Sequence, residues 1–313
     1  GVFQLSSALT GSIALRFDDV HIAVAYDVPG RADNNKITKT YYLPDFHLKY
    51  DLNDRQALRL SVSKTYTLPQ SKEISPYQYV DIGFVSEGNP NLRPSDNYNF
   101  DIKWECYPRS SELLSAAFFY KKIVNPIGRV DKGNSAGLLT YDNISKSADV
   151  MGVEAEIRKN IFSIADAKAK NTHKLSVGIN ASFLDAALIL SVLNTPERKS
   201  GLEGAAPFIL NTDVSYYYSG AKNSLTTALV FNYFSNRIYT NGTLGYQDII
   251  EEGIPTLDWV SSFKFNKNIS LKLKAANLLN PDFNLTRKSN INNEKVILNQ
   301  YKKGIDLSLG ISI

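Results

Sequence analysis

The chain has 313 residues, with 35 basic and 31 acidic side chains, a formal net charge of +4 and a single cysteine. One cysteine cannot form an intrachain disulfide, and the even charge balance gives no indication of a nucleic-acid partner. No stretch approaches the ~20 consecutive apolar residues of a transmembrane helix. The length allows one large domain or two ordinary ones, and we expect a single domain over residues 1–313. The 18 Tyr and 15 Phe favour β-structure.

Apolar and polar residues alternate along most of the chain with a period of two, which places them on opposite faces of a sheet. The clearest case is 97–106, where Tyr98, Phe100, Ile102, Trp104 and Cys106 share one face. The pattern predicts strands over 3–10, 18–28, 40–51, 56–66, 96–107, 112–124, 148–160, 172–184, 207–219, 224–238, 255–266, 269–279 and 303–313. Most of these strands are long enough to cross a bilayer at a tilt.

The connections between these strands alternate between tight and long. Outer-membrane barrels have short periplasmic turns at one rim and long extracellular loops at the other. We therefore expect an all-β fold, a transmembrane antiparallel up-and-down β-barrel with about 13 strands in this chain. A periplasmic C-terminus would place every long loop outside the cell. The long connections are 67–95, 125–147, 186–206, 239–254 and 280–302, and 161–171 is an intermediate link on the tight side.

The polar faces of the predicted strands carry charges of both signs. Charge on a lipid-facing position costs about 2–4 kcal/mol near the bilayer midplane, whereas a wet or plugged lumen tolerates it. A wide barrel with a polar interior follows from this pattern. The charged residues assigned to the lumen are Arg59, Asp101, Lys103, Glu105, Glu154, Glu156, Arg158, Asp213, Lys272, Lys274 and Asp306.

Nothing in the sequence predicts an enzyme, a cofactor site or a metal site. His21, His47 and His173 stand on separate predicted strands or at their ends, without a second ligand at metal-binding spacing. Cys106 alternates with apolar residues and has no histidine close in sequence, as expected of a lipid-facing or core side chain. The acidic group Asp248, Glu251 and Glu252 allows a cation site, but a solvated loop is the ordinary interpretation.

Four stretches resemble the barrel of TonB-dependent outer-membrane receptors, especially the Bacteroidetes type. They are 63–69 (SKTYTLP), 87–97 (EGNPNLRPSDN), 274–280 (KAANLLN) and 304–310 (GIDLSLG). The most specific residues of the resemblance are Gly88, Asn89, Pro90, Leu92 and Pro94, followed by Asn277, Leu278, Leu279 and Asn280. Because Pro90 and Pro94 fix φ, we interpret the first motif as a rigid descent from a loop into the strand that follows.

The resemblance implies energised import of a scarce nutrient across a bacterial outer membrane. It also implies contact with outer-membrane lipid, a plug domain inside the barrel, an inner-membrane TonB complex and, in some members, a surface lipoprotein. Barrels of the family close with 22 strands, so we expect this chain to be the C-terminal part, with plug and earlier strands elsewhere. Members normally end in an aromatic residue, whereas this sequence ends in Ile313.

Under this interpretation, polar and aromatic residues of the long loops contact the ligand, and deletion of 81–88 should impair uptake without affecting barrel assembly. Two alternatives stay open: a self-contained passive channel of 12–14 strands, and a soluble or surface-exposed β-sheet adhesion module. The candidate ligand-facing residues are Tyr77, Tyr79, Arg237, Tyr239, Asn241 and Tyr246.

Overall fold

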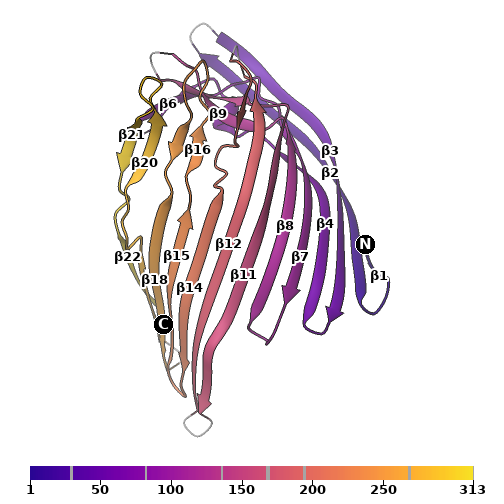
Figure 1. Cartoon of the computed structure of the whole chain (residues 1–313), viewed down its shortest axis with the longest axis vertical. Coiled ribbons are helices and arrows are strands. Elements are labelled where there is room, and N and C mark those ends of the chain that lie inside the picture. The colour runs from indigo at the N-terminus through magenta and orange to yellow at the C-terminus, as the bar shows by residue number, and fades with distance from the viewer. Residues whose placement is uncertain are drawn as a thin grey trace.

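The computed structural model describes residues 1–28, 31–81, 83–134, 137–166, 170–192, 195–266 and 269–312. Its main feature is a curved antiparallel wall, a 14-stranded sheet in which thirteen strands follow one another in chain order and β13 pairs only with β12 (Figure 1). The predicted all-β, up-and-down arrangement is confirmed. Its strands are β1 (Val2–Gln4), β2 (Leu9–Val28), β3 (Arg31–Asn53), β4 (Gln56–Thr67), β7 (Ser95–Cys106), β8 (Leu113–Val124), β11 (Ser147–Asp166), β12 (Asn171–Leu190), β13 (Arg198–Ser200), β14 (Phe208–Ser219), β15 (Ser224–Phe234), β18 (Ile254–Phe265), β19 (Ile269–Ala276) and β22 (Asp306–Ser312).

Strand register divides the wall into an apolar face and a polar face. Ile102 pairs with Phe118, Phe118 with Val153, and Val153 with Phe183, so one apolar row crosses four strands. Phe118 is 40% exposed and Val153 is 51% exposed, although neither residue is polar. An apolar surface of this extent needs a non-aqueous neighbour.

The opposite face carries the charged residues. Lys103 pairs with Ala117, Ala117 with Glu154, and Glu154 with Ser182, one residue out of step with the apolar row. Ion pairs form within this face, for example between Arg59 Nε and Glu105 Oε2 at 2.8 Å. Strand pairing places all eleven residues assigned to the lumen on this one face, as the alternation predicts.

The N-terminal strands differ from the prediction. A strand over 3–10 is wrong, because Ser6 Oγ accepts hydrogen bonds from the backbone N–H groups of Ala8 and Leu9 and holds a turn between β1 and β2. β2 then runs from Leu9 to Val28, and β3 begins at Arg31 rather than at residue 40. The part of β3 that precedes Asp45 pairs with β2 alone. β2 and β3 therefore form a hairpin that extends beyond the end of β4 (Figure 1).

Several strand ends also differ. The predicted link 161–171 is largely strand, because β11 continues to Asp166 past a bulge near Asn160. β15 ends at Phe234 and β19 ends at Ala276, both earlier than expected. β19 ends there because the next residue, Asn277, has a left-handed backbone with φ 57°.

The wall is open. β1 lies at one edge and β22 at the other, and the described residues contain no pairing between them. A closed barrel of 12–14 strands made by this chain alone therefore does not match the observed sheet. Among the described residues, no helix has both the length and the apolar character needed to cross a membrane.

Two smaller sheets and one short helix, α1 (Ser71–Ile74), lie at the end of the wall that carries the long connections (Figure 1). The tight turns lie at the other end. One small sheet has the order β5 (Gln78–Asp81), β6 (Phe84–Glu87), β10 (Leu139–Asn143), β9 (Ile127–Asp131), and the other has the order β16 (Arg237–Thr240), β17 (Ile249–Glu251), β20 (Phe283–Lys288), β21 (Lys295–Tyr301). We call these sheets, α1 and β13, with the connections that carry them, the crown.

Candidate functional site

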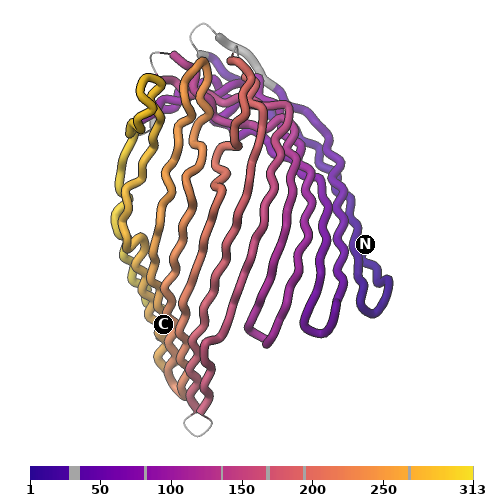
Figure 2. The backbone as a smooth tube through the Cα atoms, viewed as in Figure 1, coloured from indigo at the N-terminus to yellow at the C-terminus, as the bar shows by residue number. Residues whose placement is uncertain are grey.

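Five long connections make up the crown, and they gather at one end of the wall (Figure 2). Three hydrophobic clusters hold them together. Ile74, Leu92 and Tyr141 join the first connection to the second, and Leu139 and Ile249 belong to a cluster between the two small sheets. The long loops are therefore an ordered layer with cores of their own.

The first family motif forms a buried wedge in this layer. Gly88, Pro90, Leu92 and Pro94 are all buried, whereas the residues between them are half-buried or exposed. A Cβ atom on Gly88 would lie 2.0 Å from the backbone oxygen of Ser75, so only glycine allows this approach to the end of α1.

Polar contacts fix the motif to the second connection. Asn89 Nδ2 donates to the backbone oxygen of Tyr141 at 3.0 Å. The amide of Asn143 accepts from the backbone N–H of Arg93 at 2.9 Å and donates to the backbone oxygens of Arg93 and Asn125 at 2.8 and 2.9 Å. The motif is thus the place where the first two connections are joined above the wall.

The second family motif, residues 277–280, lies between the end of β19 and the last connection. Asn277 and Asn280 both have positive φ, at 57° and 43°, which asparagine tolerates better than most residues. Asn277 Nδ2 donates to the backbone oxygen of Gly304 at 2.7 Å, and Asn280 Oδ1 accepts from the backbone N–H of Gly304 at 3.1 Å. Leu278 donates its backbone N–H to Leu257 in β18 at 2.8 Å, whereas Leu279 is exposed.

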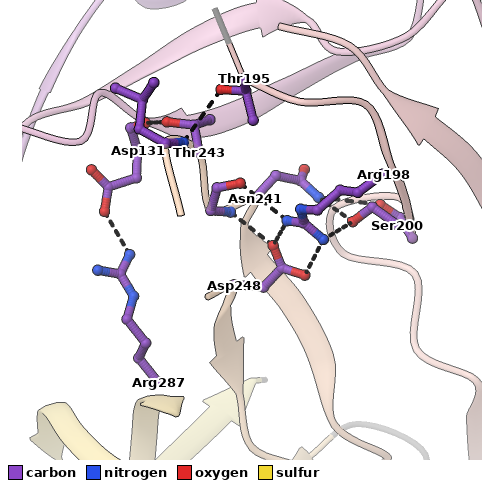
Figure 3. Close-up of polar contacts among 11 residues, drawn as sticks. Asp131, Thr195, Arg198, Ser200, Asn241, Thr243, Asp248 and Arg287 are labelled. Carbon is purple, nitrogen blue, oxygen red and sulfur yellow. Dashed lines mark hydrogen bonds and ion pairs between the residues drawn. The ribbon is translucent and has the colours of Figure 1, made fainter. Parts of the chain in front are cut away.

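Ion pairs between different connections reinforce the crown (Figure 3). Arg287 Nη2 lies 2.6 Å from Asp131 Oδ2, although the two residues are 156 positions apart. Arg198 pairs with Asp248, and the backbone N–H of Gly242 donates to the same carboxylate at 2.7 Å.

A further pair is surrounded by aromatic rings. Arg129 Nη2 lies 3.5 Å from Glu203 Oε1, and the guanidinium carbon lies 4.3 Å from the ring centroid of Tyr239 and 5.8 Å from that of Tyr141. No sequence pattern indicates the Asp131–Arg287 and Arg129–Glu203 pairs, because partners this far apart along the chain are brought together only by the fold.

Burial changes the acidity of two carboxyl groups in the crown. Desolvation raises the pKa of Asp142 above its usual range. It also raises the pKa of Glu203, an effect that the nearby Arg129 partly opposes. At Glu252, a hydrogen bond from Lys295 has the opposite effect and lowers the pKa.

A pocket of about 410 Å³ lies between the two small sheets. The Asp131–Arg287 pair forms its polar part, and apolar side chains form most of the remaining surface. Its lining residues are Val80, Gly83, Phe84, Val85, Asp131, Gly137, Leu139, Ile249, Arg287 and Leu298.

Three of the six residues predicted to face a ligand are exposed. Tyr77, Tyr79 and Tyr246 are 42%, 38% and 42% exposed. The ring of Tyr246 lies 5.3 Å from the guanidinium carbon of Arg287, beside the pocket, and Tyr79 precedes the pocket residue Val80.

The other three make contacts within the protein. Arg237 Nε lies 2.7 Å from Glu251 Oε2, and Tyr239 packs against Phe84 with ring centroids 5.9 Å apart. Asn241 is fully buried and donates to Ser200 Oγ at 3.0 Å. In this conformation these three side chains hold the crown together.

The acidic group considered as a cation site is divided among basic partners. Asp248 pairs with Arg198, Glu251 with Arg237, and Glu252 with Lys295. Within the described ranges, no three His, Cys, Asp or Glu side chains are grouped so that they could hold a metal ion.

The polar face of the wall carries shallow grooves. One, of about 430 Å³, includes His47, Lys49, Arg59 and Lys103, and another, of about 530 Å³, includes Lys272 and Lys274. Both grooves also include apolar residues, among them Leu48 and Leu60 in the first and Val260 and Leu273 in the second.

Comparison with known proteins identifies the family. The family model described as "TonB dependent receptor-like, beta-barrel" matches residues 2–278. No curated protein matches the chain.

Solved structures show the same architecture. The ferric yersiniabactin uptake receptor FyuA from Yersinia pestis is 14% identical, with a TM-score of 0.61 over 99% of this chain and 43% of the receptor. The FrpB iron transporter from Neisseria meningitidis (F5-1 variant) is 12% identical, with a TM-score of 0.60 over 99% of this chain and 44% of the transporter. A mutant of the ferric enterobactin receptor PfeA from Pseudomonas aeruginosa is 13% identical, with a TM-score of 0.58 over 98% of this chain and 43% of the receptor.

At these identities the shared feature is the fold, and the chain spans less than half the length of each solved relative. The match to the family model covers most of the sequence and all but the last wall strand. The chain belongs to the TonB-dependent receptor family of outer-membrane transport barrels, and the open wall is part of such a barrel.

Proposed function

We propose that this chain is the ligand-binding part of the barrel of an outer-membrane receptor that imports an iron chelate with energy from a TonB complex. The observation that carries the proposal is the combination of a two-faced wall with an ordered crown at one end. The iron substrate is suggested by the three solved relatives, whose names give an iron transporter and two receptors for ferric chelates. The amino-acid sequence of the first family motif, EGNPNLRPSDN at 87–97, favours a Bacteroidetes-type receptor.

The remaining parts of the receptor follow from the same proposal. The apolar face would contact lipid, and the polar face would surround a plug domain. Residues 1–313 would form a single partial domain, with the plug and the other strands outside this range, because the wall is open and covers less than half of its relatives. With the crown outside the cell, the tight turns and the C-terminal strand end would face the periplasm (Figure 1). A surface lipoprotein partner would contact the crown from outside the cell.

The function is tested by uptake in cells. Cells expressing the full-length receptor are compared with deletion cells and with cells lacking TonB, for growth under iron limitation and for uptake of radioactive iron from a panel of chelates. We expect one chelate class whose uptake requires both the receptor and TonB. Uptake that continues without TonB would indicate a passive channel and contradict the proposal.

The same assay tests the loop. Deletion of residues 81–88 should impair uptake while the receptor still reaches the outer membrane in the heat-modifiable form of a folded barrel. Normal uptake by this variant would remove this segment from the binding site.

A further inference from the structure

The pocket between the two small sheets combines a largely apolar wall with one pair of charged side chains, Asp131 and Arg287. Its walls come from four of the five long connections, so it exists only when the crown is assembled. Its volume of about 410 Å³ falls within the range of ~300–1,000 Å³ that is usual for small-molecule sites.

Most of the pocket wall suits a flat apolar group. Leu139 and Ile249 are each 1% exposed and form a rigid floor that belongs to the hydrophobic cluster between the sheets. Phe84 adds an aromatic ring, while Val80 is 82% exposed and Leu298 is 39% exposed, so apolar surface remains uncovered at the opening.

The polar part of the pocket is the guanidinium of Arg287, which is held in place by an ion pair with Asp131. Asp131 is 5% exposed, and its two carboxylate oxygens accept from Gly133 N–H at 2.8 Å and from Arg287 Nη2 at 2.6 Å. Arg287 Nε is buried and has no hydrogen-bond acceptor among the residues that the structure describes. The Arg287 side chain as a whole is 17% exposed, and a ligand in the pocket would reach that exposed part rather than the buried Nε.

We propose that this pocket binds a small ligand that combines a carboxylate with a flat apolar body, the carboxylate accepting hydrogen bonds from the guanidinium of Arg287. The planar fork of arginine donors matches the two oxygens of a carboxylate, and Asp131 and the ring of Tyr246 orient that fork in advance. The ligand is the carboxylate-bearing portion of what the receptor recognises at the cell surface. The inference rests on the proposed function, because it requires the crown to face the medium.

The test uses two probes with the same flat ring system: naphthoate, which carries a carboxylate, and naphthamide, in which a neutral amide replaces it. Binding to the purified full-length receptor is measured by saturation-transfer difference NMR in amphipol, which avoids uptake of the probes by detergent micelles. We expect naphthoate to bind at least ten-fold more tightly than naphthamide. Equal binding of the two probes would overturn the role of Arg287.

Variants locate the binding. Arg287→Lys keeps the positive charge next to Asp131 but removes the planar fork, so naphthoate affinity should fall at least ten-fold. Leu298→Trp should fill the opening and abolish binding of naphthoate. The matched control is Ile291→Trp in the same connection, where the side chain is 97% exposed and lies outside the pocket lining, and which should bind as the wild type does.

Folding is checked by the melting temperature of each variant. If Leu298→Trp melts early, Val85→Trp replaces it as the blocking change. Naphthoate binding that survives both Arg287→Lys and the blocking change would place the probe elsewhere and overturn the proposal. Failure of the receptor function is separable, because TonB-dependent uptake is measured independently in cells that express the same receptor. Energised uptake without naphthoate binding would refute the pocket alone, and naphthoate binding without energised uptake would refute the transport function alone.

Discussion

Gly88 shows how one residue of a family motif acts in the crown. The motif could be recognised in the sequence, and Pro90 and Pro94 indicated a rigid segment. The role of the glycine could not be predicted, because it depends on the backbone of α1, which approaches from a separate turn. A Cβ atom at this position would lie 2.0 Å from Ser75 O and 2.6 Å from Lys72 O.

Gly88→Ala should therefore loosen the first connection. The clashing atoms belong to the backbone and cannot rotate away, and overpacking of this kind costs about 1–3 kcal/mol. Hydrogen-exchange mass spectrometry should show lost protection in residues 71–95. Gly310→Ala is the control, because its Cβ would meet only Lys272 Cβ at 3.8 Å; equal effects of the two substitutions would contradict the packing argument.

Asp142 should make the stability of the crown depend on pH. Burial raises its pKa in the folded state, so the folded protein binds the proton more tightly than the unfolded chain does. Its stabilising contribution is fully present below the ordinary pKa of 3.8 and is lost as the pH rises through the raised folded value.

Asp142→Asn removes this titration. Hydrogen exchange of β9 and β10, corrected for the intrinsic effect of pH, should lose protection with rising pH in the wild type and change less in the variant. The same pH dependence in both proteins would assign the effect to another group.

At the scale of secondary structure, the wall could be predicted and the crown could not. Each wall strand has an apolar environment on one face and a polar environment on the other, so apolar and polar residues must alternate along it, as in β7 and β11. The upper part of the β2–β3 hairpin and the short strands of the crown have no such constraint. In 31–39 (RADNNKITK), polar residues occupy successive positions, and the strand is defined by pairing with β2.

The crown should depend on contacts between its connections, and Asn143 offers a direct test. Its side chain makes three hydrogen bonds that join the second connection to Arg93 in the first and to Asn125. Asn143→Ala should lower the local stability of both segments by about 1–3 kcal/mol, because backbone groups lose their partners. The measurement is hydrogen exchange of peptides from residues 85–95.

Asn292→Ala is the matched control, because the side-chain hydrogen bonds of Asn292 to the described residues go to Glu294 within its own turn. Loss of protection confined to the substituted connection in the Asn143 variant would show that the two connections are independent.

At the scale of the whole molecule, we propose that the apolar face of the wall contacts lipid and the polar face lines the lumen. This division predicts opposite outcomes for neighbouring residues of β11. Val153→Lys places a charge on the apolar face and should cost about 2–4 kcal/mol near the bilayer midplane. Glu154→Lys places it on the polar face and should cost much less. Equilibrium unfolding of the receptor in lipid vesicles measures both values, and similar costs would contradict the assignment of faces.

The candidate site shows the limit of prediction from sequence. The sequence identified exposed loop aromatics such as Tyr79 and Tyr246, because these residue types are common in binding surfaces. It did not identify Asp131 and Arg287, because their meeting depends on how the two small sheets pack together, with the backbone N–H of Asp131 donating to the backbone oxygen of Asn241 directly after β16. Asn241 and Tyr239 have the residue types of a binding site but are used for packing, which only burial and contacts reveal.

The measurement that tests the central claim most directly is the accessibility of spin labels at residues 153–157 of β11, placed one at a time in a Cys106→Ser background in lipid vesicles. Labels at Val153, Ala155 and Ile157 should collide with oxygen dissolved in the lipid. Labels at Glu154 and Glu156 should favour a water-soluble nickel complex or show restricted mobility against the plug. Alternation with a period of two would establish the wall as a membrane-spanning barrel surface, and uniform access of the nickel complex to all five positions would contradict it.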